Sequence, residues 1–305
     1  MFEDKAVTVS SGDFGWKFLD MLNEKNVNSS TGLPSLDLLK EIVTAYVEIQ
    51  PETAKHRLSG KERVVLTLLK LKHNLPLNFL SNLFDCSVST VSEIIVSTVP
   101  ILSKMLSSVV TMPSKEEVLS NMPVHFERYQ KVRLVLDCTE IPVSQPKCLK
   151  CALRVYSYYK KGFTCKYLIS VTPAGIIANV SKGYGGRASD NAIFAASGIL
   201  EQLLPGIDEI MVDQGFLIDE LCENHLIGLV RPPFKGKQKQ LSKVRTQKIA
   251  CARVHVERVI QRMKTFRILT TKVLWSLVPL LDDIMVIVAG VTNLSPSILA
   301  DEKFL

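Results

Sequence analysis

The sequence lacks the features that mark secreted, membrane-spanning and nucleotide-binding proteins. Its first residues, MFEDKAVTVSSGDFGW, contain neither a basic n-region nor an apolar h-region, so we expect no signal peptide. The most apolar stretch, around Ile284–Val291, is too short to span a bilayer and follows two aspartates. No P-loop is present, nor a GxGxxG after a predicted strand. We therefore expect a soluble intracellular protein with no membrane partner.

The chain also lacks a disulfide framework. It has seven cysteines, an odd number, scattered from Cys86 to Cys251, which is typical of a reducing compartment. Cys148 and Cys151 have the spacing of half a zinc site, but no second pair or Cys/His partner follows at zinc spacing. We therefore assign no zinc ion to them. Internal repeats and low-complexity tracts are absent as well.

Apolar residues are plentiful, and basic residues exceed acidic ones. Of the 305 residues, 47% are hydrophobic and 22% are charged, so the chain can bury a sizeable core as one large domain with an appendage, or as two domains. The net charge of +7 and a pI near 9.0 mildly favour a polyanionic partner.

The N-terminal part of the chain is predicted to be helical. Residues 1–34 look irregular and polar, and residues 35–112 form a helical region with helices at 36–47, 61–72, 77–84 and 88–99. Ser59 and Glu62 have capping-box spacing for the second of these helices. Ser87 can cap the last one, which Pro100 ends or kinks.

The last two of these helices have helix-turn-helix spacing, because only a short break at Asp85-Cys86-Ser87 separates them. The second would be the recognition helix. Its exposed positions carry hydroxyls and one acid but no Lys or Arg, namely Ser89, Thr90, Ser92 and Glu93. A plain helical bundle is the alternative.

The pattern changes after a linker at 113–130, whose short helix Ser114 can cap. The next domain is predicted at 131–294, with a tail at 295–305. Strands are predicted at 132–138, 167–171, 176–180, 209–212 and 227–230. Helices are predicted at 190–204 with Asp190 as the cap, and at 216–223, 243–264 and 277–294. This order describes an α/β domain with a mixed sheet flanked by helices.

Acidic residues end two of the predicted strands. Asp137 lies near the end of 132–138 and Asp213 follows 209–212, and open α/β sheets bind ligands beyond their strand ends. A third acid, Glu257, lies on the long helix four residues after Arg253. An ordinary surface salt bridge is the alternative for that pair. Three such carboxylates would suit Mg²⁺ and phosphoryl transfer.

Basic side chains precede this long helix and continue along it. The loop and the start of the helix carry Lys235, Lys237, Lys239, Lys243 and Arg245. These residues could contact DNA phosphates or form a solvated loop. Arg253 and Lys264 share the helix face of Glu257, and we include both in the tentative DNA-binding set.

Several sequence blocks occur in one order along the chain. They are Asp137-Cys138-Thr139-Glu140, Ser157-Tyr158-Tyr159-Lys160 with Thr164-Cys165-Lys166, Gly185–Asp190, Val212–Phe216, Pro232-Pro233-Phe234 and Ala252–Arg258. Together they resemble the DDE superfamily endonucleases and transposases of PIF/Harbinger and IS5-like type (the DDE Tnp4 domain), especially the branch often found with THAP fingers. The resemblance covers about Leu33 to Leu294 and includes the helix-turn-helix that precedes such domains.

The resemblance implies an RNase H-like fold. It also implies a catalytic, metal-binding triad of Asp137, Asp213 and Glu257. Asp190 matches a position that is also assigned to the metal in related proteins, although a helix N-cap explains an aspartate there equally well.

Part of the insertion-sequence signature is also present. Arg253, Glu257 and Lys264 match its R-x3-E-x6-K segment, whereas the expected tyrosine is Ala250. Gln214 stands where Lys or Arg is common in the family. Neither change touches the triad.

These observations predict a transposase-derived nuclease and strand-transfer enzyme. We expect it to use Mg²⁺ or Mn²⁺, as two ions, on double-stranded DNA. The alternative is a domesticated, catalytically silent protein that binds DNA or a partner, motivated by Ala250 and by the absence of a THAP finger from this sequence. A generic RNase H-like hydrolase acting on RNA is a third reading. Nuclear localisation, with the cytoplasm as a second compartment, a DNA-binding partner protein and a homo-oligomer are further expectations.

Overall fold

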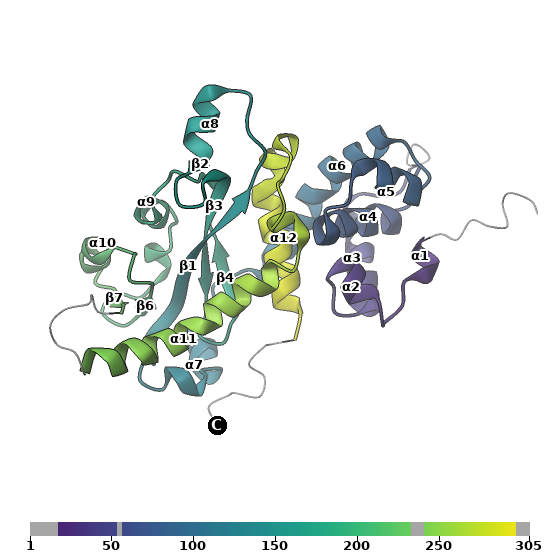
Figure 1. Cartoon of the computed structure of the whole chain (residues 1–305). Helices are drawn as coiled ribbons and strands as arrows, with labels where there is room; N and C mark the ends of the chain where they lie inside the picture. The colour runs from purple at the N-terminus through teal and green to yellow at the C-terminus, as the bar shows by residue number, and fades with distance from the viewer. Residues whose placement is uncertain (1–17, 54–56, 233–240, 297–305) are drawn as a thin grey trace, which may run out of the picture.

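The computed structural model describes residues 18–53, 57–232 and 241–296, with the side chains of the last range described from Ala252 onward. Figure 1 shows a group of N-terminal helices beside a twisted sheet, with helix α12 between them. The described chain therefore has an all-helical part and an α/β part, as the sequence predicted.

Helices cover the N-terminal part from residue 18 onward. They are α1 (Phe18–Met21), α2 (Val27–Thr31), α3 (Leu36–Ile49), α4 (Gly60–His73), α5 (Leu77–Leu83) and α6 (Val88–Leu106), which ends in the 3-10 turn η1 (Ser107–Val109). The prediction that residues 1–34 are irregular was wrong for α1 and α2. Tertiary contacts order α2, because Val27 is fully buried and Gly32, in the left-handed region, packs against the Phe266 ring.

Local capping signals are confirmed. Ser59 and Glu62 form the predicted capping box of α4, and Ser87 accepts the Thr90 amide at the start of α6. Of the two predictions for Pro100, that it ends the helix was wrong, since α6 continues through it to Leu106. Pro100 is exposed, and the buried face of the helix continues on both sides of it, so packing outweighs the lost hydrogen bond.

The predicted linker is packed rather than loose. It forms α7 (Lys115–Ser120), which Ser114 caps with a capping box, and the 3-10 turn η2 (Val124–Phe126). Phe126 is fully buried, and its ring lies 5.8 Å from that of His255. This segment therefore contributes to the core beneath the long helix that carries His255.

The sheet is mixed, and its strand order is β2-β3-β1-β6-β7. The long strand β1 (Val132–Pro142) pairs antiparallel with β3 (Gly162–Val171) and parallel with β6 (Glu209–Met211). Strand β7 (Gly228–Val230) extends the parallel side, and β3 also pairs with β2 (Tyr156–Ser157), β4 (Ile177–Val180) and β5 (Tyr184–Gly185). The prediction of an α/β fold with a mixed sheet is confirmed.

Each face of the sheet is covered by its own helices. One face packs on α11 (Leu241–Met263) and α12 (Leu281–Leu294), and α12 packs in turn on α6, so that Val135 and Ile141 of β1 share a core with the N-terminal helices. The other face packs on α9 (Asp190–Ala195) and α10 (Asp219–Asn224), with Leu134 and Leu136 of β1 in a second core. Successive residues of β1 therefore point to different cores, as strand geometry requires.

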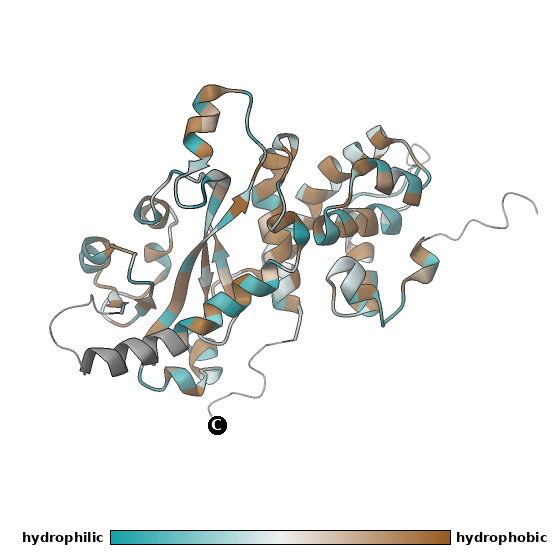
Figure 2. Cartoon of the chain, in the orientation of Figure 1, coloured by the Kyte–Doolittle hydropathy of each residue, from teal (hydrophilic) through white to brown (hydrophobic). Residues whose placement is uncertain are grey.

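Helix α12 joins the two parts of the molecule. A Cβ at Gly290 would lie 2.8 Å from the Leu106 side chain of α6, so the two helices pack closely there. Among the described residues, Val88–Val109 and Trp275–Leu294 are each long and apolar enough to cross a membrane. The expectation that the apolar stretch around Ile284–Val291 is too short to do so was therefore wrong. The apolar residues of both helices, brown in Figure 2, belong to one shared core. A helix buried in a protein core can be as long and as apolar as a membrane-spanning helix.

Several boundaries differ from the predictions. Helix α9 is capped by Ser189, not Asp190, and ends at Ala195 instead of reaching Leu204; the 3-10 turn η3 (Leu200–Gln202) follows. Helix α10 begins at Asp219, and the last helix begins with the 3-10 segment η5 (Trp275–Leu280). Helix α8 (Leu149–Val155) was not predicted, and another 3-10 turn, η4 (Arg267–Leu269), follows α11.

Candidate active site

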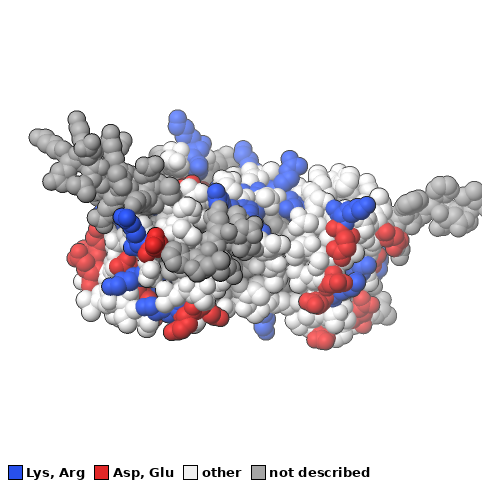
Figure 3. Space-filling model, turned by 90° about the horizontal axis from the view of Figure 1, so that it is seen from below, with Lys and Arg blue, Asp and Glu red and all other residues white. Residues whose placement is uncertain are grey.

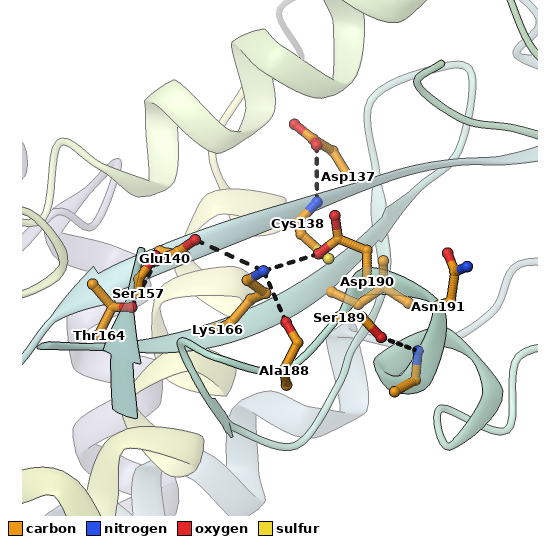
Figure 4. Close-up of polar contacts among 12 residues, drawn as sticks. Asp137, Cys138, Glu140, Ser157, Thr164, Lys166, Ala188, Ser189, Asp190 and Asn191 are labelled. Atoms are coloured by element: carbon orange, nitrogen blue, oxygen red, sulfur yellow. Dashed lines mark hydrogen bonds and ion pairs between the residues drawn. The ribbon is translucent and has the colours of Figure 1, made fainter. Parts of the chain in front are cut away.

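Asp137 lies in the middle of β1 rather than at its end. The strand continues to Pro142, because residues 137–142 pair with residues 164–169 of β3. The Asp137 side chain leaves the strand on the side facing α11, opposite the cluster around Lys166 (Figure 4). Its Oδ1 accepts the Cys138 amide at 2.8 Å. The carboxylate is therefore held on the sheet face that α11 covers.

Asp213 and Glu257 are joined by one arginine. Asp213 follows β6, and its Oδ1 accepts the Gln214 amide at 2.7 Å. The Arg253 Nη1 donates to the same oxygen at 2.8 Å, and the Arg253 Nη2 lies 4.0 Å from Glu257 Oε1. The Arg253 side chain is only 12% exposed, whereas those of Asp213 and Glu257 are 51% and 57% exposed. The largely buried Arg253 side chain therefore pairs with two acids whose side chains are accessible to solvent.

Asp137 interacts electrostatically with all members of this group. Burial raises the pKa of Asp137 to about 6; the positive charge of Arg253 and the Cys138 amide oppose this rise, and the negative charges of Asp213 and Glu257 add to it. The three predicted acids, Asp137, Asp213 and Glu257, therefore lie within electrostatic range of one another, and Arg253 pairs directly with the last two. Glu257 is not an isolated member of a surface salt bridge, because its arginine partner also binds an acid from β6.

The donor set of this group fits a hard divalent cation. Carboxylate oxygens are the ligands that Mg²⁺ prefers, and one or two carboxylates per ion are usual. In this structure the guanidinium of Arg253 supplies the positive charge beside Asp213 and Glu257. Within the described ranges, no group of three or more His, Cys, Asp or Glu has metal-binding geometry. The acids are thus close together but not in a preformed coordination shell.

Asp190 lies in a different cluster, on the other side of β1. Its Oδ1 accepts Lys166 Nζ at 3.2 Å, and the same ammonium group donates to the Ala188 carbonyl at 3.0 Å (Figure 4). Lys166 also lies 3.8 Å from Glu140, and Asp190 raises the pKa of the Cys138 thiol, after the larger effect of burial. The structure therefore does not bring Asp190 to the other three acids. It acts here as the partner of Lys166.

Sequence reasoning gave Lys166 no role. Its only signal was the Thr164-Cys165-Lys166 block. Lys166 is largely buried, and together with Glu140 and Thr164 it fastens the loop before α9 to β1 and β3. A buried lysine needs such partners, since an unpaired charge in that position would be costly.

The structure describes the side chains of only some of the predicted basic residues. Lys235, Lys237 and Lys239 lie outside the described residues, and Lys243 and Arg245 belong to α11 at positions whose side chains are not described. Lys264 follows α11 and interacts electrostatically with Asp137. In Figure 3 the upper edge of the molecule carries Lys and Arg with few acidic residues, and acidic residues gather mainly below.

Two family models match the sequence. One describes a DDE superfamily endonuclease and matches residues 136–293, which is a little over half of the chain. The chain belongs to this family. The other describes the helix-turn-helix of DDE superfamily endonucleases and matches residues 56–108, so α4 to α6 of this DDE superfamily endonuclease are its helix-turn-helix region. Among curated proteins, none matches the chain.

The matched family regions cover the acidic group, the sheet and helices α4 to α6. The matched region begins beside Asp137 and contains Asp213, Glu257 and the whole sheet after the first residues of β1. The helix-turn-helix region is typical of DNA binding. Cys148 and Cys151 lie at the start of α8 with Cys148 exposed, and neither contacts the acidic group in any described interaction.

Proposed function

We propose that this DDE superfamily endonuclease is a transposase-derived, divalent-metal-dependent nuclease and strand-transfer enzyme with an RNase H-like fold. Its substrate is double-stranded DNA. The observation that carries the proposal is that Arg253 pairs with both Asp213 and Glu257, and that Asp137 lies within electrostatic range of all three. Each acid comes from a different element of the domain, so local sequence preferences alone do not explain the group.

The three acids would hold the metal through their carboxylate oxygens. Two bound Mg²⁺ or Mn²⁺ ions supply activation of the attacking oxygen and stabilisation of the leaving oxygen. Asp137 is the most rigidly held of the three acids, because β1 fixes its backbone and the Cys138 amide donates to its Oδ1. Asp213 and Glu257 face solvent, which gives a phosphodiester access to them.

Two cations complete the proposed site. Arg253 pairs with both Asp213 and Glu257 in the protein without metal. Lys264 interacts electrostatically with Asp137, and its ammonium group can stabilise negative charge on the phosphate. Asp190 is not needed as a ligand in this arrangement. Its interaction with Lys166 supports a positioning role for the loop before α9.

The helix-turn-helix region would bring the duplex to this site. Strand transfer would then use the 3′-OH that cleavage releases as the nucleophile on target DNA. Nuclear localisation, a DNA-binding partner protein and a homo-oligomer remain part of the proposal, because DNA is the substrate and the α6 recognition helix carries no Lys or Arg in its first turns.

Plasmid nicking with Mg²⁺ or Mn²⁺ tests the proposal. Asp213→Asn should lower the rate at least about a hundredfold, since metal-ion catalysis is worth several kcal/mol. Glu220→Gln is the matched control, because it removes one negative charge from an exposed position shortly after Asp213. Undiminished nicking by Asp213→Asn would contradict the metal assignment. Preferred cleavage of an RNA–DNA hybrid would favour an RNase H-like activity instead.

One observation favours a silent, DNA-binding or partner-binding protein as the second candidate. Arg253 occupies the space beside Asp213 and Glu257, and no metal-binding group is preformed among the described residues. Titration with Mn²⁺ by calorimetry separates the two candidates. Saturable binding that Asp213→Asn abolishes supports the nuclease, whereas retained DNA binding without metal binding supports the silent protein.

A further inference from the structure

A groove lies beside the acidic group at the end of the sheet. Its volume is about 640 Å³, and its walls come from the end of β1, the β2–β3 hairpin and the segment after α11. This volume is within the range of about 300–1,000 Å³ that is typical of small-ligand pockets.

The charge of this groove is strongly positive. The lysines that line it are Lys160, Lys161, Lys264 and Lys272. Its one acidic residue, Glu140, accepts a hydrogen bond from Thr164 at 2.6 Å and lies 3.8 Å from Lys166. The charge of Glu140 is therefore balanced by Lys166, and the four lysines make the electrostatic potential of the groove positive. A polyanionic ligand is the one that this groove attracts.

A row of aromatic rings leads out of the groove. Phe163 and Tyr156 line it with their ring centroids 5.5 Å apart, and the Tyr158 ring lies 5.4 Å from that of Tyr156. Tyr158 and Tyr159 are 73% and 83% exposed, and Lys160 Nζ lies 4.8 Å from the centre of the Tyr159 ring. Two adjacent tyrosines that expose so much ring surface are free to stack on a ligand.

The hairpin holds these tyrosines in place. Tyr156 pairs with Phe163 and Ser157 with Gly162, so residues 158–161 form the connecting turn. Ser157 Oγ accepts the Lys160 amide at 3.1 Å, and Lys161 adopts a left-handed conformation with φ of 50°. The turn is therefore ordered by its own hydrogen bonds, and the tyrosines are presented before any ligand binds.

The groove is electrostatically connected to the acidic group. Lys264, which lines the groove, interacts with both Lys160 and Asp137, and burial lowers its pKa. Glu140, which also lines the groove, follows Asp137 by three residues on β1.

We propose that the groove binds an unpaired stretch of DNA next to the cleaved phosphodiester. Bases stack on Tyr158 and Tyr159, and phosphates lie against the lysines. Unpaired bases expose their faces to aromatic side chains, whereas bases inside a duplex do not, and such stacking is tolerant of sequence. The inference rests on the proposed function in that it takes DNA as the ligand. It adds a site for a melted or flipped strand, in a segment outside the acidic group.

The test measures binding of the full chain to a single-stranded oligonucleotide that contains 2-aminopurine, in EDTA so that cleavage cannot occur. Replacing both tyrosines by Ala should weaken binding at least about fivefold, the lower limit for losing one stacked base. It should also abolish the stacking-dependent quenching of 2-aminopurine. Tyr158→Phe should bind like the wild type, since the ring is kept. Both tyrosines are exposed, and melting curves will show that the variants remain folded.

The lysines are tested by the salt dependence of the same binding. The double variant Lys160→Gln, Lys161→Gln should reduce the slope of log K against log salt by about 0.7 per lysine. Lys131→Gln is the matched control, because Lys131 is exposed at the opposite end of β1, and it should leave the slope unchanged.

The results separate this inference from the proposed nuclease. Equal single-strand affinity of the wild type and the double tyrosine variant would overturn the inference. An equal loss of affinity for a blunt duplex would overturn it as well, because the hairpin would then be a general DNA contact. Tyrosine-dependent binding without metal-dependent nicking would support the groove and refute the nuclease.

Discussion

Asp137 should destabilise the metal-free protein at neutral pH. Burial raises its pKa from 3.8 to about 6, so the folded state favours the protonated carboxyl more than the unfolded state does. For a raised acid pKa, stability is greatest at low pH and decreases as the pH rises from about 4 through about 6. A shift of about two units corresponds to roughly 3 kcal/mol of lost stability above pH 7.

Asp137→Asn is the perturbation that isolates this cost. The amide keeps an oxygen that can accept the Cys138 amide, and it removes the charge. In EDTA at pH 8 the variant should exceed the wild type by about 3 kcal/mol in free energy of unfolding, and therefore by several degrees in Tm. The difference should fall to roughly half at pH 5 and to about a fifth at pH 4, and it should vanish below about pH 3 as the unfolded carboxyl becomes fully protonated.

Two further measurements make the result decisive. Mg²⁺ should raise the Tm of the wild type and leave Asp137→Asn almost unchanged, because a ligand stabilises only the state that binds it. Asp208→Asn is the control of opposite sign. Asp208 is buried with Arg133 Nε at 3.5 Å and Lys115 Nζ at 3.7 Å, and breaking such a pair costs about 3–5 kcal/mol. A stability gain for Asp137→Asn that is independent of pH, or no gain at all, would refute the reasoning.

Three other predictions concern separate parts of the chain. Arg253→Gln should raise the pKa of Asp137 further, because the Arg253 charge lowers it; the pH dependence of the Tm will show this as a shift of the transition to higher pH. Gly185→Ala should lower the Tm by several degrees, because the added Cβ would collide with the carbonyl oxygen of Arg154. Gly215→Ala is the control: its Cβ would meet no atom within 4 Å and should leave the Tm unchanged. Ser59→Ala should reduce the free energy of unfolding by about 1 kcal/mol through loss of the α4 cap, measured in urea.

Much of the local structure could be predicted from the sequence. The caps at Ser59, Ser87 and Ser114 were predicted correctly, because each depends on a hydrogen bond to an amide three residues away. The main strands were found for a similar reason, since burial on both faces produces apolar, β-branched runs. The family resemblance was carried by short blocks, and the matching family models confirm it at the level of the DDE superfamily endonucleases.

The errors arose where distant contacts compete with local preference. Helix α2 exists because Gly32 packs against Phe266, and α6 passes Pro100 because its buried face continues on both sides. Asp190 looked like either a cap or a metal ligand, but Ser189 is the cap and Lys166, from β3, is the partner. The contacts with Phe266 and Lys166 cannot be found from spacing, whereas the Ser189 cap is local, three residues before the Ala192 amide, and was missed.

The acidic group of Asp137, Asp213 and Glu257 shows most clearly which features the sequence determined and which depended on the tertiary structure. The sequence by itself determined that Asp137 and Asp213 accompany strands and that Glu257 lies one helical turn after Arg253. Only the tertiary structure decided that Arg253 also binds Asp213, forty residues earlier. The physical reason is that helical spacing places Arg253 beside Glu257 in any helix. A contact with a second acid depends on where α11 crosses the sheet.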